Sequence, residues 1–187
     1  MSDRTVPDWL RRARSGWTWT GASRPPWAEE PGPGQESVWD YPRPPRLAPD
    51  TRHIVVRDGD HVIAETRRAV RILETASPPT VYIPRSDIDD GLIQAEAGSS
   101  LCEWKGPAAY WTVVLPDGTR HERVGWSYER PFPEFDSIRG HLSFYPARLA
   151  CTIDGEAVTP QPGGFYGGWI TSEVVGPFKG AAGSTGW

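Results

Sequence analysis

The chain has 187 residues, a formal net charge of −4 and an isoelectric point of about 5.6. Binding to nucleic acid without sequence preference requires a strong basic excess, so this composition argues against a nucleic-acid partner. Ten tryptophans exclude an intrinsically disordered chain, because disordered segments lack the large apolar side chains that build a core. Glycine and proline contribute 20 residues each, which predicts many turns and few long helices.

The two cysteines, Cys102 and Cys151, lie far apart in the sequence and form no CxxC pair. A zinc ribbon is therefore excluded, and a secreted disulfide scaffold would use more cysteines in a shorter chain. The four histidines are scattered and predict no metal site. The N-terminal segment lacks the apolar stretch of a signal peptide, and no run reaches the roughly 20 apolar residues of a membrane helix. We therefore expect a cytoplasmic protein that binds no membrane, metal or cofactor.

Residues 1–37 are interpreted as an N-terminal arm without a core of its own. The first 50 residues hold nine prolines and five tryptophans, and only the stretch after Pro7 is typical of a short helix. The tryptophans of this arm are expected to dock on the domain or on a second copy of it, which would make a homodimer. A disordered tail is the alternative, since chain termini are often poorly ordered.

From residue 53 onward the pattern is typical of β-strands. Residues 53–66 predict a hairpin around Asp58-Gly59. The strand at 69–75 places Val70, Ile72 and Glu74 on one face, and the final proline of residues 77–84 predicts an edge strand or an early stop of that strand. Residues 86–93 are interpreted as a single helical turn capped by Ser86.

The segments 100–105 and 108–115 are expected to pair across a turn at Gly106-Pro107. In an extended strand Cys102 shares a face with Trp104, whereas Glu103 shares the other face with Lys105. The thiol, carboxylate and amine of this segment therefore face one hollow only if a bulge intervenes.

Further turns at 116–119 and at Asp154-Gly155 separate short strands, and a short helix or loop is expected at 131–140. Strands recur about every 8–12 residues with almost no helical period, which predicts an all-β sandwich, barrel or folded-over sheet. The glycine-rich tail from Pro160 to Trp187 is expected to form an irregular strap whose GGFYGGW segment plugs Phe165 and Tyr166 into the sheet.

Several blocks of sequence resemble a known family. They are VWDYPRPPRL (38–47), ETASPPTVYIP (74–84), CEWKG (102–106), WSYERPFPEF (126–135), GHLSFYP (140–146), PQPGGFYGGW (160–169) and VGPFKG (175–180). Together they are similar to the bacterial and fungal "domain of unknown function 427" family. The resemblance implies that residues 38–187 form one compact domain of the β-tent type, a fold shared with methionine-R-sulfoxide reductases and the thalidomide-binding domain of cereblon. Zinc cysteines hold the sheets together in those relatives; here the paired cysteines are missing, so packing must replace the metal.

The family also carries the label nucleotidyltransferase-like, and the residues argue against that activity. Such enzymes place two carboxylates on the strand after a Gly-Ser turn to hold Mg²⁺. Here Gly98-Ser99-Ser100 is followed only by Glu103, and Asp58-Gly59-Asp60 forms a hairpin turn. The resemblance thus implies a pocket but no reaction.

Three candidate reactive residues lie in these blocks. Cys102 is a candidate nucleophile or redox thiol, with a small buried apolar residue as the alternative. Glu74 ends an apolar strand face and is a candidate general acid or base, with a rim glutamate paired to an arginine as the alternative. Lys105 could pair with Glu74 across strands, for acid–base chemistry or for structure alone. His141 is retained as a proton-transfer candidate because it lies in a family block.

Aromatic residues of the same strands are candidate ligand contacts. Tyrosine and tryptophan provide flat walls with one polar atom each, although most strand aromatics belong to the core. We expect four of them to line a cleft: Tyr82, Tyr110, Trp126 and Tyr145. The sequence thus predicts a protein that binds a small polar ligand between aromatic walls. Two alternatives stay open, namely an enzyme that uses Cys102 or the Glu74–Lys105 pair, and an interaction protein that dimerises through its arm.

Overall fold

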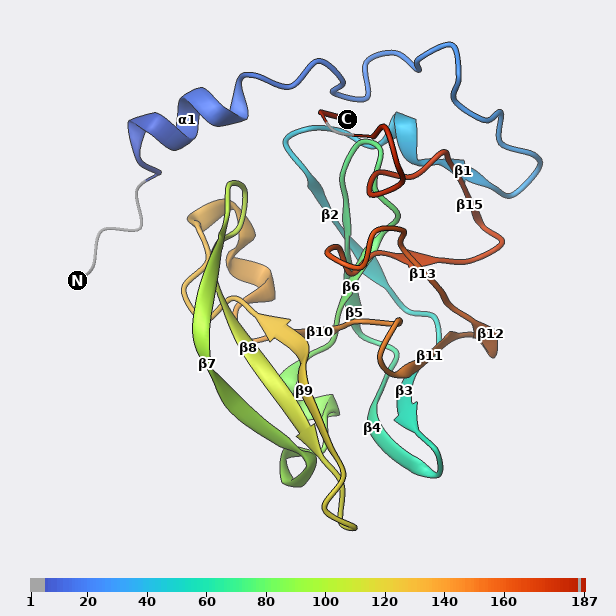
Figure 1. Cartoon of the computed structure of the whole chain (residues 1–187). Coiled ribbons are helices and arrows are strands. Elements are labelled where there is room, and N and C mark those ends of the chain that lie inside the picture. Colours follow the sequence, from blue (N-terminus) through green and yellow to red (C-terminus); the bar gives the residue numbers. More distant parts are fainter. Residues whose placement is uncertain (1–5, 185) are drawn as a thin grey trace.

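A computed structural model describes residues 6–184 and 186–187, and it confirms the all-β prediction. Helix α1 (Asp8–Arg14) is the one α-helix of the described residues, and the main sheets are antiparallel. Figure 1 shows β7 to β10 as one curved layer with β2, β5 and β6 beside it. No described helix has the length and apolarity needed to cross a membrane.

Three sheets make up most of the fold. The first has the order β10-β9-β8-β7, with β7 (Ile93–Cys102), β8 (Gly106–Val114), β9 (Arg120–Ser127) and β10 (Leu142–Phe144). The second has the order β12-β11-β3-β4, with β3 (Ile54–Asp58), β4 (His61–Thr66), β11 (Ala150–Ile153) and β12 (Glu156–Ala157). The third has the order β2-β5-β6, with β2 (Arg46–Asp50), β5 (Ala69–Leu73) and β6 (Thr80–Tyr82).

Two short pairs tie the ends of the chain to this frame. Strand β1 (Glu36–Ser37) runs parallel to β15 (Val174–Val175), and β13 (Thr159–Pro160) pairs with β14 (Trp169–Ile170). Both pairs are only two residues long, so side-chain packing must supply most of their stability. Trp169 supplies it for β14, because its indole is fully buried and donates a hydrogen bond to the Phe144 carbonyl.

Strand β5 lies between two apolar clusters, and its side chains alternate between them. Ile72 and Val70 face a cluster built around Tyr82, Trp104 and Trp126, whereas Leu73 faces a cluster with Trp39. Successive side chains of a strand point to opposite faces of the sheet, so the expected assignment of Ile72 and Leu73 to different faces is confirmed. Glu74 follows on the face of Ile72 and thereby reaches the hollow described below.

The turn between β7 and β8 differs from the prediction. Cys102 pairs with Gly106 and Leu101 with Pro107, so the loop is made of residues 103–105 and not of Gly106-Pro107. Gly106 has a φ of 100°, a conformation that an L side chain rarely adopts, and it allows the chain to leave the three-residue loop. Strand alternation therefore ends at Cys102. Lys105 turns back toward the thiol and does not lie on the opposite face.

Two further local predictions need correction. Residues 85–92 form two short 3₁₀ turns, Arg85–Asp87 and Asp90–Leu92, where one helical turn was expected. The side chain of Asp89 caps the second turn by accepting from the Gly91 N–H, so Ser86 is not the cap. In the strap, Phe165 is 76% exposed and does not plug into the sheet. Trp169 is the fully buried aromatic instead, because β14 anchors its backbone.

The N-terminal arm lies along its own chain. Figure 1 shows it running over one end of the sheets toward β1, close to the C-terminus. Trp19 and Trp27 pack edge-on against each other and against Trp39, and Trp27 stacks on Trp187. These indoles join both ends of the chain to the core cluster of Trp39. Trp9 remains 56% exposed.

Candidate functional site

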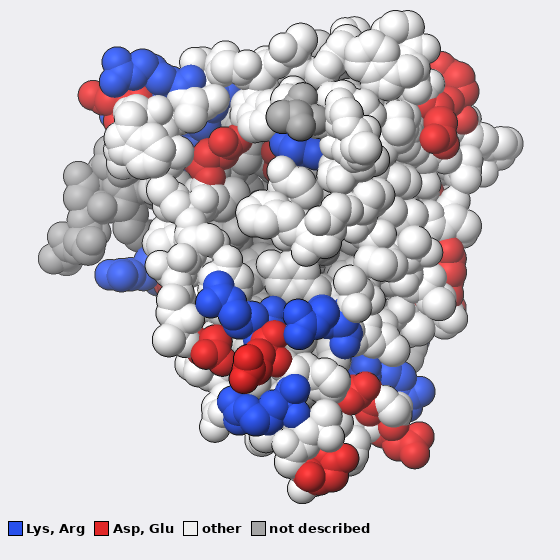
Figure 2. Space-filling view, in the orientation of Figure 1, with Lys and Arg blue, Asp and Glu red and all other residues white. Residues whose placement is uncertain are grey.

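A cavity of about 810 Å³ opens between the first sheet, the third sheet and the strap. Its walls come from β5, β6, β8, β9, the 103–105 loop and residues 161–167. Every sequence-derived candidate except His141 lines it, namely Glu74, Tyr82, Cys102, Lys105, Tyr110, Trp126 and Tyr145. In the orientation of Figure 2, acidic and basic side chains gather over the lower part of the molecule, and the centre of this face is mainly uncharged.

Lys105 forms the charged floor of the cavity. The residue is only 8% exposed, and its ammonium lies 5.8 Å from the centre of the Tyr128 ring. Burial disfavours the charged form, but the neighbouring Cys102, Tyr82 and Glu74 favour it more strongly and raise the pKa of Lys105 above its usual value. Lys105 is therefore an ammonium ion at neutral pH. No carboxylate of the described residues lies within 4.0 Å of it.

A wall of aromatic rings surrounds this amine. The Trp126 indole N–H donates to the Tyr82 hydroxyl over 3.1 Å, and the two rings meet edge-on. Tyr145 packs on Trp126 with ring centres 4.5 Å apart, and Tyr128 contacts Tyr82 at 6.2 Å. Burial is the main cause that raises the pKa of Tyr82 and of Tyr128, so both phenols stay protonated at neutral pH. The floor thus combines one cation with hydroxyl groups that can donate or accept hydrogen bonds.

Glu74 is paired with an arginine on the opposite side of the cavity. The Arg43 side chain is 1% exposed, and its Nε lies 3.3 Å from the Glu74 Oε1, within ion-pair distance. That N–H bond is not aligned for a hydrogen bond, whereas the other guanidinium nitrogens donate to the carbonyls of Trp19 and Thr75. Glu74 and Lys105 therefore share one hollow, but the ion pair of Glu74 is with Arg43 and the expected Glu74–Lys105 pair is not formed.

The arm contributes Trp17 to the site, and the strap contributes Lys179. The Trp17 indole N–H donates to Glu103 Oε1 over 2.7 Å, which fixes the ring at the cavity. Both Arg43 and Lys179 place their charged groups 4.1 Å from the centre of this ring. Such contacts hold a cation against an aromatic face without neutralising it.

Sequence reasoning missed Lys179, although a simple count could have found it. The chain has 18 arginines but only two lysines, Lys105 and Lys179. Both lysines line the same cavity, and no described carboxylate lies within ion-pair distance of either. Arginine occupies every other basic position of this chain, exposed or, as at Arg43, buried, so the two lysines are distinctive in offering a compact amine. Arg43 and Trp17 could not have been found from spacing, because they approach the site from other segments.

The indole N–H of Trp104, a residue of the cavity wall, has no hydrogen-bond partner in the described part of the chain. Trp104 is 3% exposed and lines the cavity, and its buried indole N–H makes no hydrogen bond in the structure. Leaving a buried donor unpaired costs about 1–3 kcal/mol. The ring itself is held by Arg14, whose guanidinium lies 5.1 Å from its centre and donates to the Trp104 carbonyl. A ligand or water that accepts from this N–H would recover the cost.

The strap closes one side of the site through a glycine that has no room for a side chain. A Cβ on Gly167 would lie 2.1 Å from the edge of the Trp126 ring, so the backbone rests directly on the indole. Gln161 braces this segment by accepting from the Gly168 N–H and donating to the Lys179 carbonyl. Tyr110, at the other side of the cavity, donates to Ser100 and lies under the Arg123 guanidinium at 4.0 Å.

His141 does not reach this cavity. It lines a second hollow of about 440 Å³ together with Trp111, Glu129 and Arg139. Its ring Nδ1 lies 3.3 Å from the Arg139 carbonyl. His141 therefore cannot exchange a proton with a ligand held by Lys105. Among residues 6–184 and 186–187, no group of three His, Cys, Asp or Glu side chains is arranged to hold a metal ion.

Comparison with protein families identifies the central part of the chain. Residues 46–156 match the family described as Domain of unknown function (DUF427). The chain belongs to this family. The matched segment runs from β2 to β12 and contains all seven sequence-derived candidates, whereas Trp17, Arg43 and Lys179 lie outside it. A search of curated proteins found no significant match.

Proposed function

We propose that this DUF427 protein binds a small ligand that carries an anionic or carbonyl group on a flat apolar body. The observation that carries the proposal is the buried ammonium of Lys105, which faces a cavity of about 810 Å³ without an ion-paired carboxylate. The ammonium lacks a directly paired carboxylate among the described residues, and an incoming anion supplies that charge-assisted contact. Ligand pockets commonly have volumes of about 300–1,000 Å³, so the hollow suits a metabolite-sized molecule.

The remaining walls support the same ligand class. Trp126 and Tyr145 offer ring faces for the body of the ligand, and the fully buried Tyr82 supports Trp126 by accepting from its indole N–H. Glu74 accepts a donor group of the ligand at the side held by Arg43. A carboxylate on an aromatic ring satisfies these requirements with few rotatable bonds, which reduces the entropy lost on binding.

Calorimetry and thermal shift with benzoate test this proposal, with benzyl alcohol as the neutral analogue. Benzoate is expected to bind more tightly than benzyl alcohol and to raise the melting temperature. In Lys105→Met the difference is expected to disappear, because a hydrogen bond to a charged group contributes about 1.5–3 kcal/mol, or about tenfold or more in Kd. Equal binding of both compounds by the native protein, or an unchanged preference in Lys105→Met, contradicts the anion site.

A thiol enzyme is the second candidate, and the surroundings of Cys102 favour it. The Cys102 thiol is half-buried in the cavity wall, which it shares with Lys105 and Tyr128. Cys151 is a built-in control, since burial raises the pKa of its thiol to about 12. Iodoacetamide at neutral pH is expected to alkylate Cys102 faster than free glutathione and to leave Cys151 unmodified. A Cys102 rate below that of glutathione would exclude a nucleophilic role.

A further inference from the structure

The two lysines of the cavity differ in environment, and the difference assigns them different chemistry. Lys105 is buried beside thiol and phenol groups and holds its charge. Lys179 is partly exposed at the cavity wall, where its ammonium lies 4.1 Å from the Trp17 ring and 5.5 Å from the Tyr166 ring. Its backbone is fixed on both sides, since its N–H donates to the Ala76 carbonyl and its carbonyl accepts from Gln161.

Burial of Lys179 in the cavity wall favours the neutral amine, although most of the surrounding charges favour the ammonium form. Burial lowers the pKa of Lys179 below its usual value, and the nearby Arg43 guanidinium acts in the same direction. The neighbouring Glu74 and Glu103 oppose this effect without cancelling it. The titratable and charged groups that face the amine are Arg43, Glu74, Cys102, Glu103 and Tyr166. A larger fraction of Lys179 than of an ordinary lysine is therefore a nucleophile at neutral pH.

We propose that Lys179 forms a reversible imine with an aldehyde or ketone whose anionic group is held by Lys105. This inference rests on the proposed function and narrows its ligand class to small carbonyl-bearing acids. Arginine cannot replace a lysine in this reaction, because a guanidinium stays protonated, which fits the placement of both lysines of the chain around one hollow.

The condensation balances without an oxidant or reductant. The lone pair of the Lys179 Nζ attacks the carbonyl carbon, and the π electrons of the carbonyl move to its oxygen. A proton passes from the nitrogen to that oxygen and gives a carbinolamine. The C–O bond then breaks, a second proton leaves with the hydroxyl as water, and a C=N bond remains. Glu74 lines the same cavity as Lys179, and we assign it the transfer of these protons.

Reductive trapping with para-formylbenzoate tests the inference on the full chain. The protein is treated with this compound and cyanoborohydride at neutral pH, and peptide mapping locates the secondary amine. We expect modification at Lys179, several-fold faster than at N-acetyl-lysine in the same tube, and little modification of Lys105. Lys179→Arg keeps the positive charge and is expected to abolish the adduct while benzoate still binds, which shows that the variant is folded. Labelling of Lys179 no faster than N-acetyl-lysine, or preferential labelling of Lys105, overturns the inference.

Benzaldehyde separates this inference from the proposed anion site. The native protein is expected to label with para-formylbenzoate faster than with benzaldehyde, and Lys105→Met is expected to remove that preference. Suppose that Lys179 is labelled faster than N-acetyl-lysine by both aldehydes, and that the native protein reacts equally fast with para-formylbenzoate and benzaldehyde. The anion site at Lys105 is then wrong, and the imine-forming role of Lys179 stands. If benzoate binds through Lys105 but Lys179 labels no faster than N-acetyl-lysine, the anion site stands and the imine is wrong.

Discussion

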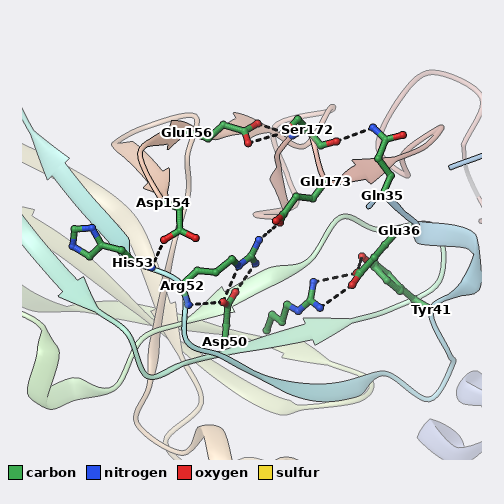
Figure 3. A network of polar contacts seen from close by, with 11 residues as sticks. Gln35, Glu36, Tyr41, Asp50, Arg52, His53, Asp154, Glu156, Ser172 and Glu173 are labelled. Atoms are coloured by element: carbon green, nitrogen blue, oxygen red, sulfur yellow. Dashed lines mark hydrogen bonds and ion pairs between the residues drawn. The ribbon is translucent and has the colours of Figure 1, made fainter. Parts of the chain in front are cut away.

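Two polar regions of this protein use charge in opposite ways. Figure 3 shows the first, a network that joins the start of the domain to the strap. There Arg52 donates two side-chain hydrogen bonds to Asp50 and also forms an ion pair with Glu173. Arg71 donates a hydrogen bond to each carboxylate oxygen of Glu36. In the cavity, by contrast, Lys105 and Lys179 face a hollow with no ion-paired carboxylate.

The charged side chains of the network are paired within the chain, whereas Lys105 and Lys179 of the cavity have no ion-paired carboxylate among the described residues. Arginines of the network are satisfied by planar carboxylates within the chain, so they contribute to stability and offer little to a ligand. In the cavity, neither lysine has such a partner in the described part of the chain, and the Trp104 N–H has no hydrogen-bond partner there. If binding uses the charges of the cavity, as we propose, substitutions in the two regions should have opposite effects.

The largest effect is expected from Asp50→Ala. The Asp50 side chain is 3% exposed, and its removal leaves the Arg52 guanidinium without its bidentate partner. We expect a loss of about 2–4 kcal/mol in the free energy of unfolding, measured by urea denaturation with tryptophan fluorescence. Glu30→Gln is the matched control, because its pair with Arg24 is exposed and should change stability by less than about 1 kcal/mol. A small effect of Asp50→Ala would mean that the network does not hold the strap.

Gly167→Ala should disturb the cavity more than the fold. The added methyl would lie 2.1 Å from the Trp126 ring and must displace either the strap or the indole. We expect weaker benzoate binding and a loss of about 1–3 kcal/mol in the free energy of unfolding. Gly16→Ala is the control, since its Cβ would meet only the Ala13 carbonyl at an ordinary 3.5 Å. Unchanged benzoate affinity in Gly167→Ala would remove the strap from the site.

As the pH falls, the ion pairs of the network should be lost before the cavity is affected. Burial opposes ionisation of Asp50 and Glu36, but hydrogen bonds from Arg52, and from Arg71 and Tyr41, outweigh it and keep the pKa of each carboxyl below its usual value. Such groups stabilise the fold fully above their unfolded-state pKa, near about 4, and lose that contribution as the pH falls through the folded-state pKa. The free energy of unfolding should therefore decline below about pH 4–5, and less steeply in Asp50→Asn. An equally steep decline in that variant would place the acid-sensitive groups elsewhere.

The smallest effect on stability is expected from Lys105→Met. Methionine has a similar length and needs no counter-charge, so the free energy of unfolding should stay the same or rise by about 1–2 kcal/mol while benzoate binding is lost. Urea denaturation and calorimetry on one preparation measure both quantities. A loss of stability similar to that of Asp50→Ala would show that Lys105 is a structural charge, and the contrast between the two regions would fail.

Local sequence patterns predicted much of the fold because they encode local geometry. The Asp58-Gly59 hairpin, the alternation of Ile72 and Leu73 and the turn at Asp154-Gly155 follow from backbone preferences and side-chain periodicity. The 103–105 loop was misplaced by a few residues, since Gly106 acts after the turn and not within it. An error of this size changes which side chains share a face, and it hid the approach of Lys105 to Cys102.

The sequence by itself determined the class of fold, the family and seven of the side chains that line the cavity. Only the tertiary structure decided their partners: Arg43 took the carboxylate of Glu74, and Lys179 arrived from the strap beside Trp17 of the arm. The physical reason is the separation along the sequence of the residues that interact. Turns and strand faces depend on neighbours a few residues away, whereas an ion pair or a cavity wall depends on side chains that meet only after distant segments have packed.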